Sequence, residues 1–174
     1  WVRPTNGIGT FDSVLMKTSN SGWTDGYGLY YSGGNLIFFV NQYNVDSVST
    51  AVSTDEWAHI VATYDGSFLR LYKNGVEVDA VAYSQPINHS TNSLLIGQGT
   101  GSNSWSWVGD LDEVALYDSV LSPARIAAHY QASIDEGIVT GPGAVDVLVR
   151  DNAISGGSRG MRLLSAASGD VVDN

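Results

Sequence analysis

The chain has no cysteine and little positive charge. Among its 174 residues the absence of Cys rules out both a disulfide framework and a zinc site built from thiolates. Eight Lys and Arg stand against 18 Asp and Glu, which gives a formal charge of −10. Such a chain repels phosphate groups, so nucleic acids and anionic membranes are poor partners. Its apolar runs are also too interrupted for a membrane-spanning helix.

Histidine is scarce as well, with only three in the chain. His89 and His129 do not have the spacing of a metal-binding pair, and the sequence shows no Ser–His–Asp arrangement. His59 stands among apolar residues in a strand-like run, so we expect a hydrogen-bonded core histidine rather than a ligand or base. Trp57, at the start of the same run, is expected in the core too.

The residues that are abundant favour an all-β protein. Hydrophobic residues make up 43% of the chain, and 20 Gly punctuate short runs with a period of two. This pattern is typical of antiparallel strands packed as a sandwich. The expected strands are Val14–Lys17, Gly28–Tyr31, Leu36–Val40, Ser47–Val52, His59–Tyr64, Phe68–Lys73, Val76–Tyr83, Ser93–Ile96 and Val108–Tyr117.

Two turn motifs join three of these strands. Asn74 and Gly75 tolerate positive φ angles, so they predict a two-residue hairpin between Phe68–Lys73 and Val76–Tyr83. Asp65-Gly66 predicts a similar turn before Phe68. The three strands between His59 and Tyr83 should therefore form a meander.

One helix and one domain boundary follow towards the C-terminus. Ser122 and Pro123 fit the cap and first position of a helix that runs to about Ala132. The glycine-rich stretch 137–143 then resembles a linker. We predict one domain over residues 1–137. Residues 138–174 should hold the linker and the first hairpin of a following β-sandwich module, with strands at Ala144–Arg150 and Met161–Leu164.

Two stretches resemble laminin G-like domains, which are jelly rolls of the concanavalin A-like kind. One runs from Trp57 to Gly66 and continues from Leu69 to Gly75, and the other runs from Gly109 to Asp118 and continues to Pro123. The resemblance covers about residues 1–135. It implies an antiparallel two-sheet jelly-roll sandwich with one short C-terminal helix. Members of the family have further strands before the position of Trp1, which we expect to belong to a longer parent chain, the alternative being a strand donated by another chain.

Three acidic residues raise the question of catalysis. Retaining glycoside hydrolysis needs two carboxyl groups about 5 Å apart on the same side of the sugar. In a regular strand Asp110 and Asp112 would share a face while Glu113 points away, so we expect no enzyme. Asp112 would then lie in an apolar row and need a partner. The resemblance implies a structural calcium ion there, with Asp110 as a second candidate ligand, and hydrogen bonds to backbone amides or to His59 are the alternative.

A polar loop suggests a sugar-binding site. Trp105 and Asn103 lie in this loop, and an indole ring displayed there would stack on a sugar while amides bind its hydroxyls. Trp23, Asp25 and Tyr27 lie in a second glycine-rich loop that is expected to line the same rim. The alternative is that one Trp closes the end of the sandwich and the other packs on a neighbouring subunit.

Together these patterns predict a non-catalytic module that binds carbohydrate or protein. Residues 144–174 resemble modules that follow laminin G-like domains in phage structural proteins and bacterial surface proteins. We therefore expect an extracellular or virion-surface location, as in a tail fibre, a decoration protein or an adhesin, within an assembly that can be a homo-oligomer. The alternatives are a purely architectural module and an accessory module of a secreted glycoside hydrolase.

Overall fold

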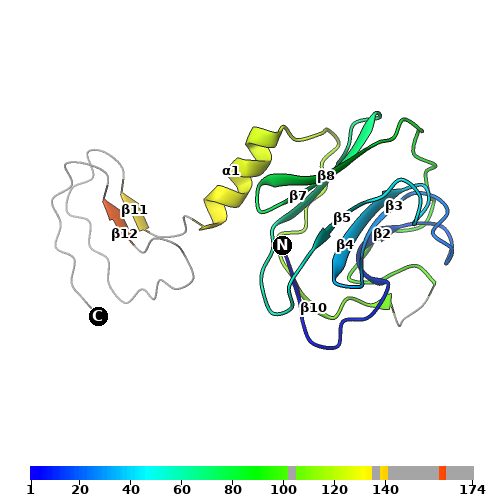
Figure 1. Ribbon diagram of the computed structural model, residues 1–174, viewed down its shortest axis with the longest axis horizontal. Coiled ribbons are helices and arrows are strands. Elements are labelled where there is room, and N and C mark those ends of the chain that lie inside the picture. The colour runs from blue at the N-terminus through cyan, green and yellow to red at the C-terminus, as the bar shows by residue number, and fades with distance from the viewer. Residues whose placement is uncertain (102–104, 135–137, 141–160, 164–174) are drawn as a thin grey trace. The chain divides into compact units, whose positions relative to one another are not determined.

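The computed structural model describes residues 1–101, 105–134, 138–140 and 161–163. Its backbone divides into two compact units, Trp1–Ala127 and Ala128–Asn174. The first unit contains two antiparallel sheets and a small strand pair (Figure 1). The larger sheet has the order β5 (Val48–Ala51), β4 (Asn35–Val40), β3 (Tyr27–Ser32), β2 (Asp12–Lys17) and β9 (Leu95–Ile96). The smaller sheet consists of β6 (Ile60–Tyr64), β7 (Phe68–Lys73) and β8 (Val76–Ala82), and β1 (Val2–Pro4) pairs with β10 (Gly109–Leu111). The predicted all-β antiparallel sandwich is confirmed.

The predicted meander is also confirmed. In the hairpin, Lys73 pairs with Val76, and the two residues between them have φ angles of 52° at Asn74 and 81° at Gly75. Both angles are positive, which is the conformation that a two-residue hairpin turn requires and that Asn and Gly adopt at low cost. Strand β6 pairs with the other edge of β7.

The interior of the sandwich lies between the two sheets. Along β4 the side chains alternate, and Leu36, Phe38 and Val40 are buried on the inner side. Phe38 and Val40 pack with Leu69 and Leu71 from β7 of the smaller sheet, whereas Leu36 packs in a second cluster with Val2, Val14, Val52 and Ala58. The contact between β4 and β7 thus joins the two sheets.

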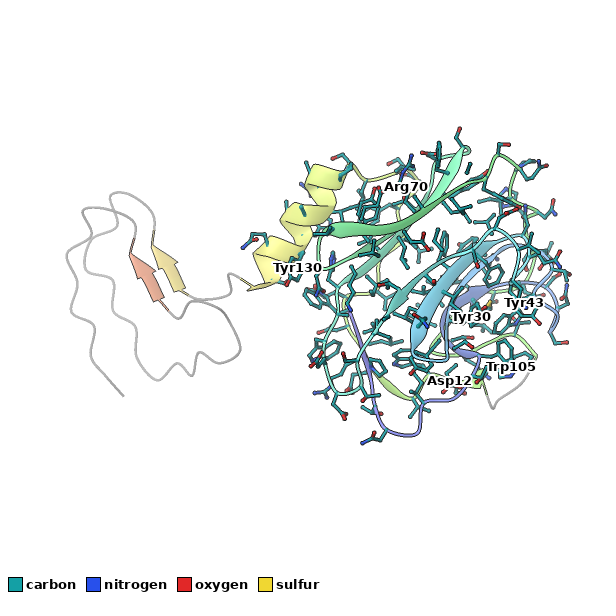
Figure 2. All side chains as sticks on the ribbon, viewed as in Figure 1. Asp12, Tyr30, Tyr43, Arg70, Trp105 and Tyr130 are labelled. Carbon is teal, nitrogen blue, oxygen red and sulfur yellow. The ribbon has the colours of Figure 1, made fainter. Side chains whose placement is uncertain are left out.

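The opposite face of the larger sheet is covered as well, by an aromatic group that we call the outer aromatic cluster. Its fully buried members are Met16, Trp23, Tyr30 and Phe39, and its partly buried members are Phe11, Ile37, Tyr43, Leu95 and Trp105. Tyr30, Tyr43 and Trp105 lie on the same side of this sheet (Figure 2). Burial raises the pKa of Tyr30 to about 12, and the nearby Tyr43 adds to the effect. The chain's own loops therefore close the face that the smaller sheet leaves uncovered.

The strand predicted over Val108–Tyr117 is much shorter than expected. Strand β10 ends at Leu111, and Glu113 has a φ angle of 47°, which breaks the extended backbone. Residues 112–121 are not part of any strand. Several apolar side chains in this region are consequently exposed, namely Val114, Leu116, Tyr117 and Val120.

The helix starts where the sequence predicts. Helix α1 covers Pro123–Ile134, and the Oγ of Ser122 accepts a hydrogen bond from the Arg125 N–H at 3.3 Å. Ile126, in the first turns of the helix, is fully buried. The predicted Ser cap and Pro at the first helical position are confirmed.

Beyond α1, the described part of the second unit is a pair of short strands. Strand β11 (Ile138–Thr140) lies within the stretch predicted as a linker, and it pairs in parallel with β12 (Met161–Leu163). Parallel neighbours cannot be joined by a tight turn, so these two strands are not a hairpin. The strand predicted at Ala144–Arg150 lies outside the described residues. The domain division near residue 138 stays a prediction.

A charged turn between β6 and β7 gives a testable pH dependence. The side chain of Asp65 accepts hydrogen bonds from Arg70 at 2.5 Å and from the Phe68 N–H at 2.7 Å, and these hold the pKa of Asp65 below its ordinary value of 3.8. A lowered pKa in the folded state stabilises the fold above the ordinary pKa, and this contribution disappears as the pH falls through the folded value.

We expect Asp65→Asn to remove this part of the acid dependence, because asparagine can still accept the turn hydrogen bonds but does not ionise. Urea unfolding of both proteins, from neutral pH to about pH 2, measures the effect. The stability of the variant should fall less steeply below pH 3.8. Parallel pH profiles for the two proteins would contradict the assignment.

Candidate functional site

The two tryptophans predicted to be displayed for sugar binding belong to the outer aromatic cluster. Trp23 is only 2% exposed, and its indole N–H donates to the carbonyl oxygen of Thr100 at 3.2 Å. The rings of Trp23 and Trp105 meet edge to face, with centroids 5.1 Å apart. The prediction that Trp23 lines an exposed rim was therefore wrong. Its φ angle of 47° turns the side chain back onto the sheet. Trp105 is partly buried.

The other predicted rim residues are separated by the fold. Asp25 accepts hydrogen bonds from the backbone N–H of Ser19, at 2.8 Å, and from its hydroxyl group, so its carboxylate closes a local turn. Tyr27 is partly buried and packs against the sandwich interior, on the opposite side of the sheet from Trp23. Asn103 lies outside the described residues. A sugar-binding role for Trp105 and Asp25 stays a prediction.

The two aspartates predicted as metal ligands lie apart from any buried apolar row. The carboxylate of Asp110 binds Arg3 at 2.6 Å, and both side chains are about half exposed. Asp112 is exposed and accepts a hydrogen bond from the Glu113 N–H at 2.8 Å. The expected burial of Asp112 was wrong because β10 ends before it. In the part of the chain that the structure describes, no three His, Cys, Asp or Glu side chains are grouped to hold a metal ion. Calcium binding stays a prediction.

Of the two residues near the start of β6 that were predicted for the core, one is buried and the other is exposed. His59 is buried, as expected, with its ring centroid 5.1 Å from that of Trp1. Trp57, in contrast, is 42% exposed, and the guanidinium group of Arg3 lies 5.3 Å from its ring centroid. The core prediction for Trp57 was wrong because the residue precedes the strand, where side chains do not yet alternate.

Polar side chains line a groove at one end of the larger sheet, and no single sequence motif predicted this groove. We call it the amide groove, and its volume is about 350 Å³. Three segments of the chain form it. Its lining residues are Thr24, then Val40 at the end of β4 with Asn41, Gln42, Val45 and Asp46 after it, and finally Tyr83, Gln85, Pro86 and Asn88 after β8.

Asn41 forms the floor of the amide groove. It is 7% exposed. Its side-chain N–H groups donate to the hydroxyl of Tyr83 at 2.8 Å and to the carbonyl oxygen of Pro86 at 2.9 Å. Its side-chain oxygen accepts the backbone N–H of Asn88 at 2.6 Å. One buried amide thus ties the loop after β4 to the segment after β8, and it leaves none of these buried polar groups unpaired.

Further hydrogen bonds hold the segment after β8 in place. The backbone N–H of Tyr83 donates to the carbonyl oxygen of Ser67 at 2.8 Å, and the hydroxyl of Tyr64 donates to the carbonyl oxygen of Gln85 at 2.5 Å. The rings of Tyr64 and Tyr83 also meet edge to face, with centroids 5.8 Å apart. Burial raises the pKa of Tyr64 above its ordinary value of 10.0. This wall of the groove has a fixed backbone.

The loop after β4 is fixed in a different way. The φ angles of Asn41, Asn44 and Asp46 are 66°, 65° and 46°, in the left-handed region that Asn and Asp tolerate better than other side chains. Tyr43 anchors the middle of the loop, because its ring packs in the outer aromatic cluster and its N–H donates to the carbonyl oxygen of Trp23 at 3.2 Å. The side chains of Gln42, Val45 and Asp46 are left exposed on the groove.

Comparison with known families identifies this architecture. Residues 1–127 match the laminin G type 3 family model, described as the concanavalin A-like lectin/glucanases superfamily. The chain belongs to this superfamily. Its family region contains both sheets, the outer aromatic cluster and the amide groove.

One solved structure that matches the chain is an S-layer domain-containing protein (residues 221–444) from Clostridium thermocellum. The two share 23% sequence identity and a TM-score of 0.40, and the match covers 75% of this chain and 66% of that one. No curated protein sequence matches the chain. Within the described residues, no helix has the length and apolar composition needed to cross a membrane.

In this concanavalin A-like module the sequence did not predict the amide groove, because the segments that line it are far apart along the chain. The loop after β4 and the segment after β8 are separated by about 40 positions, and only the packing of the two sheets brings them together. A local signal was nevertheless present. Asn and Gln recur at 41, 42 and 44 and again at 85 and 88, immediately after two strands. Polar loops at the ends of strands are common places for binding residues.

Proposed function

We propose that this module is a non-catalytic glycan-binding module of an extracellular protein, with the amide groove as its binding site. The observation that carries the proposal is that the groove combines a buried structural residue with exposed polar side chains. A buried, hydrogen-bonded Asn41 forms the floor, while Gln42, Asp46 and Gln85 stand exposed on the walls. A binding site with a fixed backbone avoids the entropic cost of ordering a loop when it takes up a ligand.

The chemistry of the walls suits a sugar. Side-chain amides both donate and accept hydrogen bonds, as sugar hydroxyls do, and Gln42, Gln85 and Asn88 supply three such groups. Val45 and Pro86 add small apolar surfaces that can cover the C–H faces of a ring. The volume of about 350 Å³ is near the lower end of the range of ligand pockets, which favours a short ligand of about one or two rings.

The carboxylates of the module support a role without catalysis. Among the residues that line the amide groove, Asp46 is the one carboxylate, whereas glycoside hydrolysis uses a facing pair. Asp110 and Asp112, which first suggested catalysis, are bound to Arg3 and to a backbone N–H. The alternative of an accessory module in a secreted glycoside hydrolase remains compatible with this proposal, because catalysis would then lie elsewhere in the parent protein.

A double variant in the groove tests the site. We expect the double variant Gln42→Ala and Gln85→Ala to bind glycans about tenfold more weakly, because two neutral hydrogen bonds are lost. Both side chains are exposed, so the melting temperature should stay unchanged. The measurement is a glycan array, followed by calorimetric titration of the best ligand.

The matched control is Gln131→Ala, which removes an exposed amide from α1, outside the groove. Its affinity should equal that of the unchanged protein. Equal glycan affinity of the double variant and the control would refute the groove as the site. The absence of binding to any glycan would favour the architectural alternative, in which loop aromatics contact neighbouring subunits, although the burial of Trp23 in its own chain argues against that arrangement. The tail-fibre, decoration-protein and adhesin settings stay predictions.

A further inference from the structure

The amide groove contains one formal charge at neutral pH, and that charge is negative. Among its ten lining residues there is no Lys, Arg or His, and Asp46 is the single acidic one. The remaining polar side chains are amides and hydroxyls. An anionic ligand would therefore meet no cation on the walls and one carboxylate.

The cations of the first unit are engaged at other places. Arg3 binds Asp110, Arg70 binds Asp65 and Glu77, and Lys73 donates to the carbonyl oxygen of Ala51 at 2.7 Å. Lys17 donates to the carbonyl oxygen of Asn92, and Arg125 lies in α1. None of these side chains lines the groove, and the whole chain carries a formal charge of −10. Both the local and the long-range field thus repel anions.

Asp46 is suited to bind a neutral sugar directly. Its side chain is exposed on the groove, and its φ angle of 46° is one that Asn or Asp tolerates. An ionised carboxylate accepts hydrogen bonds through two oxygens, which matches a pair of adjacent hydroxyl groups on a sugar ring, and such charge-assisted bonds are stronger than neutral ones. The same carboxylate repels a carboxylate or sulfate group on a ligand.

We propose that the amide groove selects neutral sugars and rejects sialylated, uronic and sulfated ones, with Asp46 as the residue that sets this selectivity. The inference rests on the proposed glycan-binding function and specifies its ligand class. Selectivity here is a difference between two affinities, produced by attraction to vicinal hydroxyls together with repulsion of anionic groups.

The test compares Asp46→Asn with the unchanged protein on neutral oligosaccharides and their sialylated and sulfated counterparts. The unchanged protein should prefer the neutral member of each pair by about tenfold or more. Asp46→Asn keeps the size of the side chain and its tolerance of positive φ but removes the charge. It should bind neutral sugars more weakly and shift the ratio of neutral to acidic binding towards one.

The matched control is Asp118→Asn, which removes an exposed carboxylate outside the groove and makes the net charge less negative by the same amount. It should leave the ratio unchanged. Equal or tighter binding of acidic sugars by the unchanged protein, or the same ratio in Asp46→Asn, would overturn the selectivity while leaving glycan binding intact. If no sugar of either kind bound, the proposed function itself would fail and this inference with it.

Discussion

Replacing Trp23 with alanine is expected to lower the free energy of unfolding by about 3–5 kcal/mol. The side chain is 2% exposed, and its ring meets those of Tyr30, Tyr43 and Trp105 with centroids 5.1–5.7 Å apart. Alanine would leave a cavity in the centre of the outer aromatic cluster and would also lose the hydrogen bond to Thr100. Urea unfolding monitored by circular dichroism measures the change.

The matched control is Trp57→Ala. Trp57 is 42% exposed and touches the guanidinium of Arg3, so its removal should cost no more than about 1 kcal/mol. Similar losses for the two tryptophans would show that the outer aromatic cluster is not a part of the core. The same experiment distinguishes the burial of Trp23 from the exposed display that its loop suggested.

Replacing Asn41 with alanine is expected to cost about 2–4 kcal/mol and to abolish glycan binding. The amide makes three hydrogen bonds, at 2.6–2.9 Å, to Tyr83, Pro86 and Asn88. Their loss leaves buried partners unsatisfied, and alanine also tolerates the φ angle of 66° less well than asparagine. Because both walls are attached to this amide, their positions should change together. Thermal unfolding and titration with the best ligand report the two effects.

Asn44→Ala separates the backbone contribution from the hydrogen bonds. Asn44 has nearly the same φ angle, 65°, but its side chain is exposed. We expect it to cost about 1 kcal/mol, with glycan affinity retained. If Asn41→Ala were no more harmful than Asn44→Ala, the three hydrogen bonds would not hold the groove together.

The sequence correctly predicted those turns and helix ends that depend on a few adjacent residues. The hairpin at Asn74-Gly75 and the helix start at Ser122-Pro123 each depend on a few adjacent residues, so the sequence was sufficient to locate them. The strand predicted beyond Leu111 failed for the opposite reason. A run of alternating apolar residues becomes a strand only if another strand pairs with it, and the pairing of β10 with β1 stops at Leu111.

The candidate site was harder to predict than the fold because burial of a loop residue depends on how the loop closes. Trp23 and Tyr27 are four positions apart, yet one lies in the outer aromatic cluster and the other against the sandwich interior. Asn41 looked like an ordinary polar residue after a strand. Its importance becomes visible only when Tyr83, Pro86 and Asn88 are brought next to it.

The separation of floor and walls in the amide groove affects how such a module can evolve. Mutations at Gln42, Val45 or Gln85 alter exposed side chains that the fold does not need. Mutations at Asn41 endanger the whole end of the sheet. A descendant could therefore acquire a new ligand through a few exchanges at the rim, each nearly neutral for folding, while the scaffold beneath stays the same.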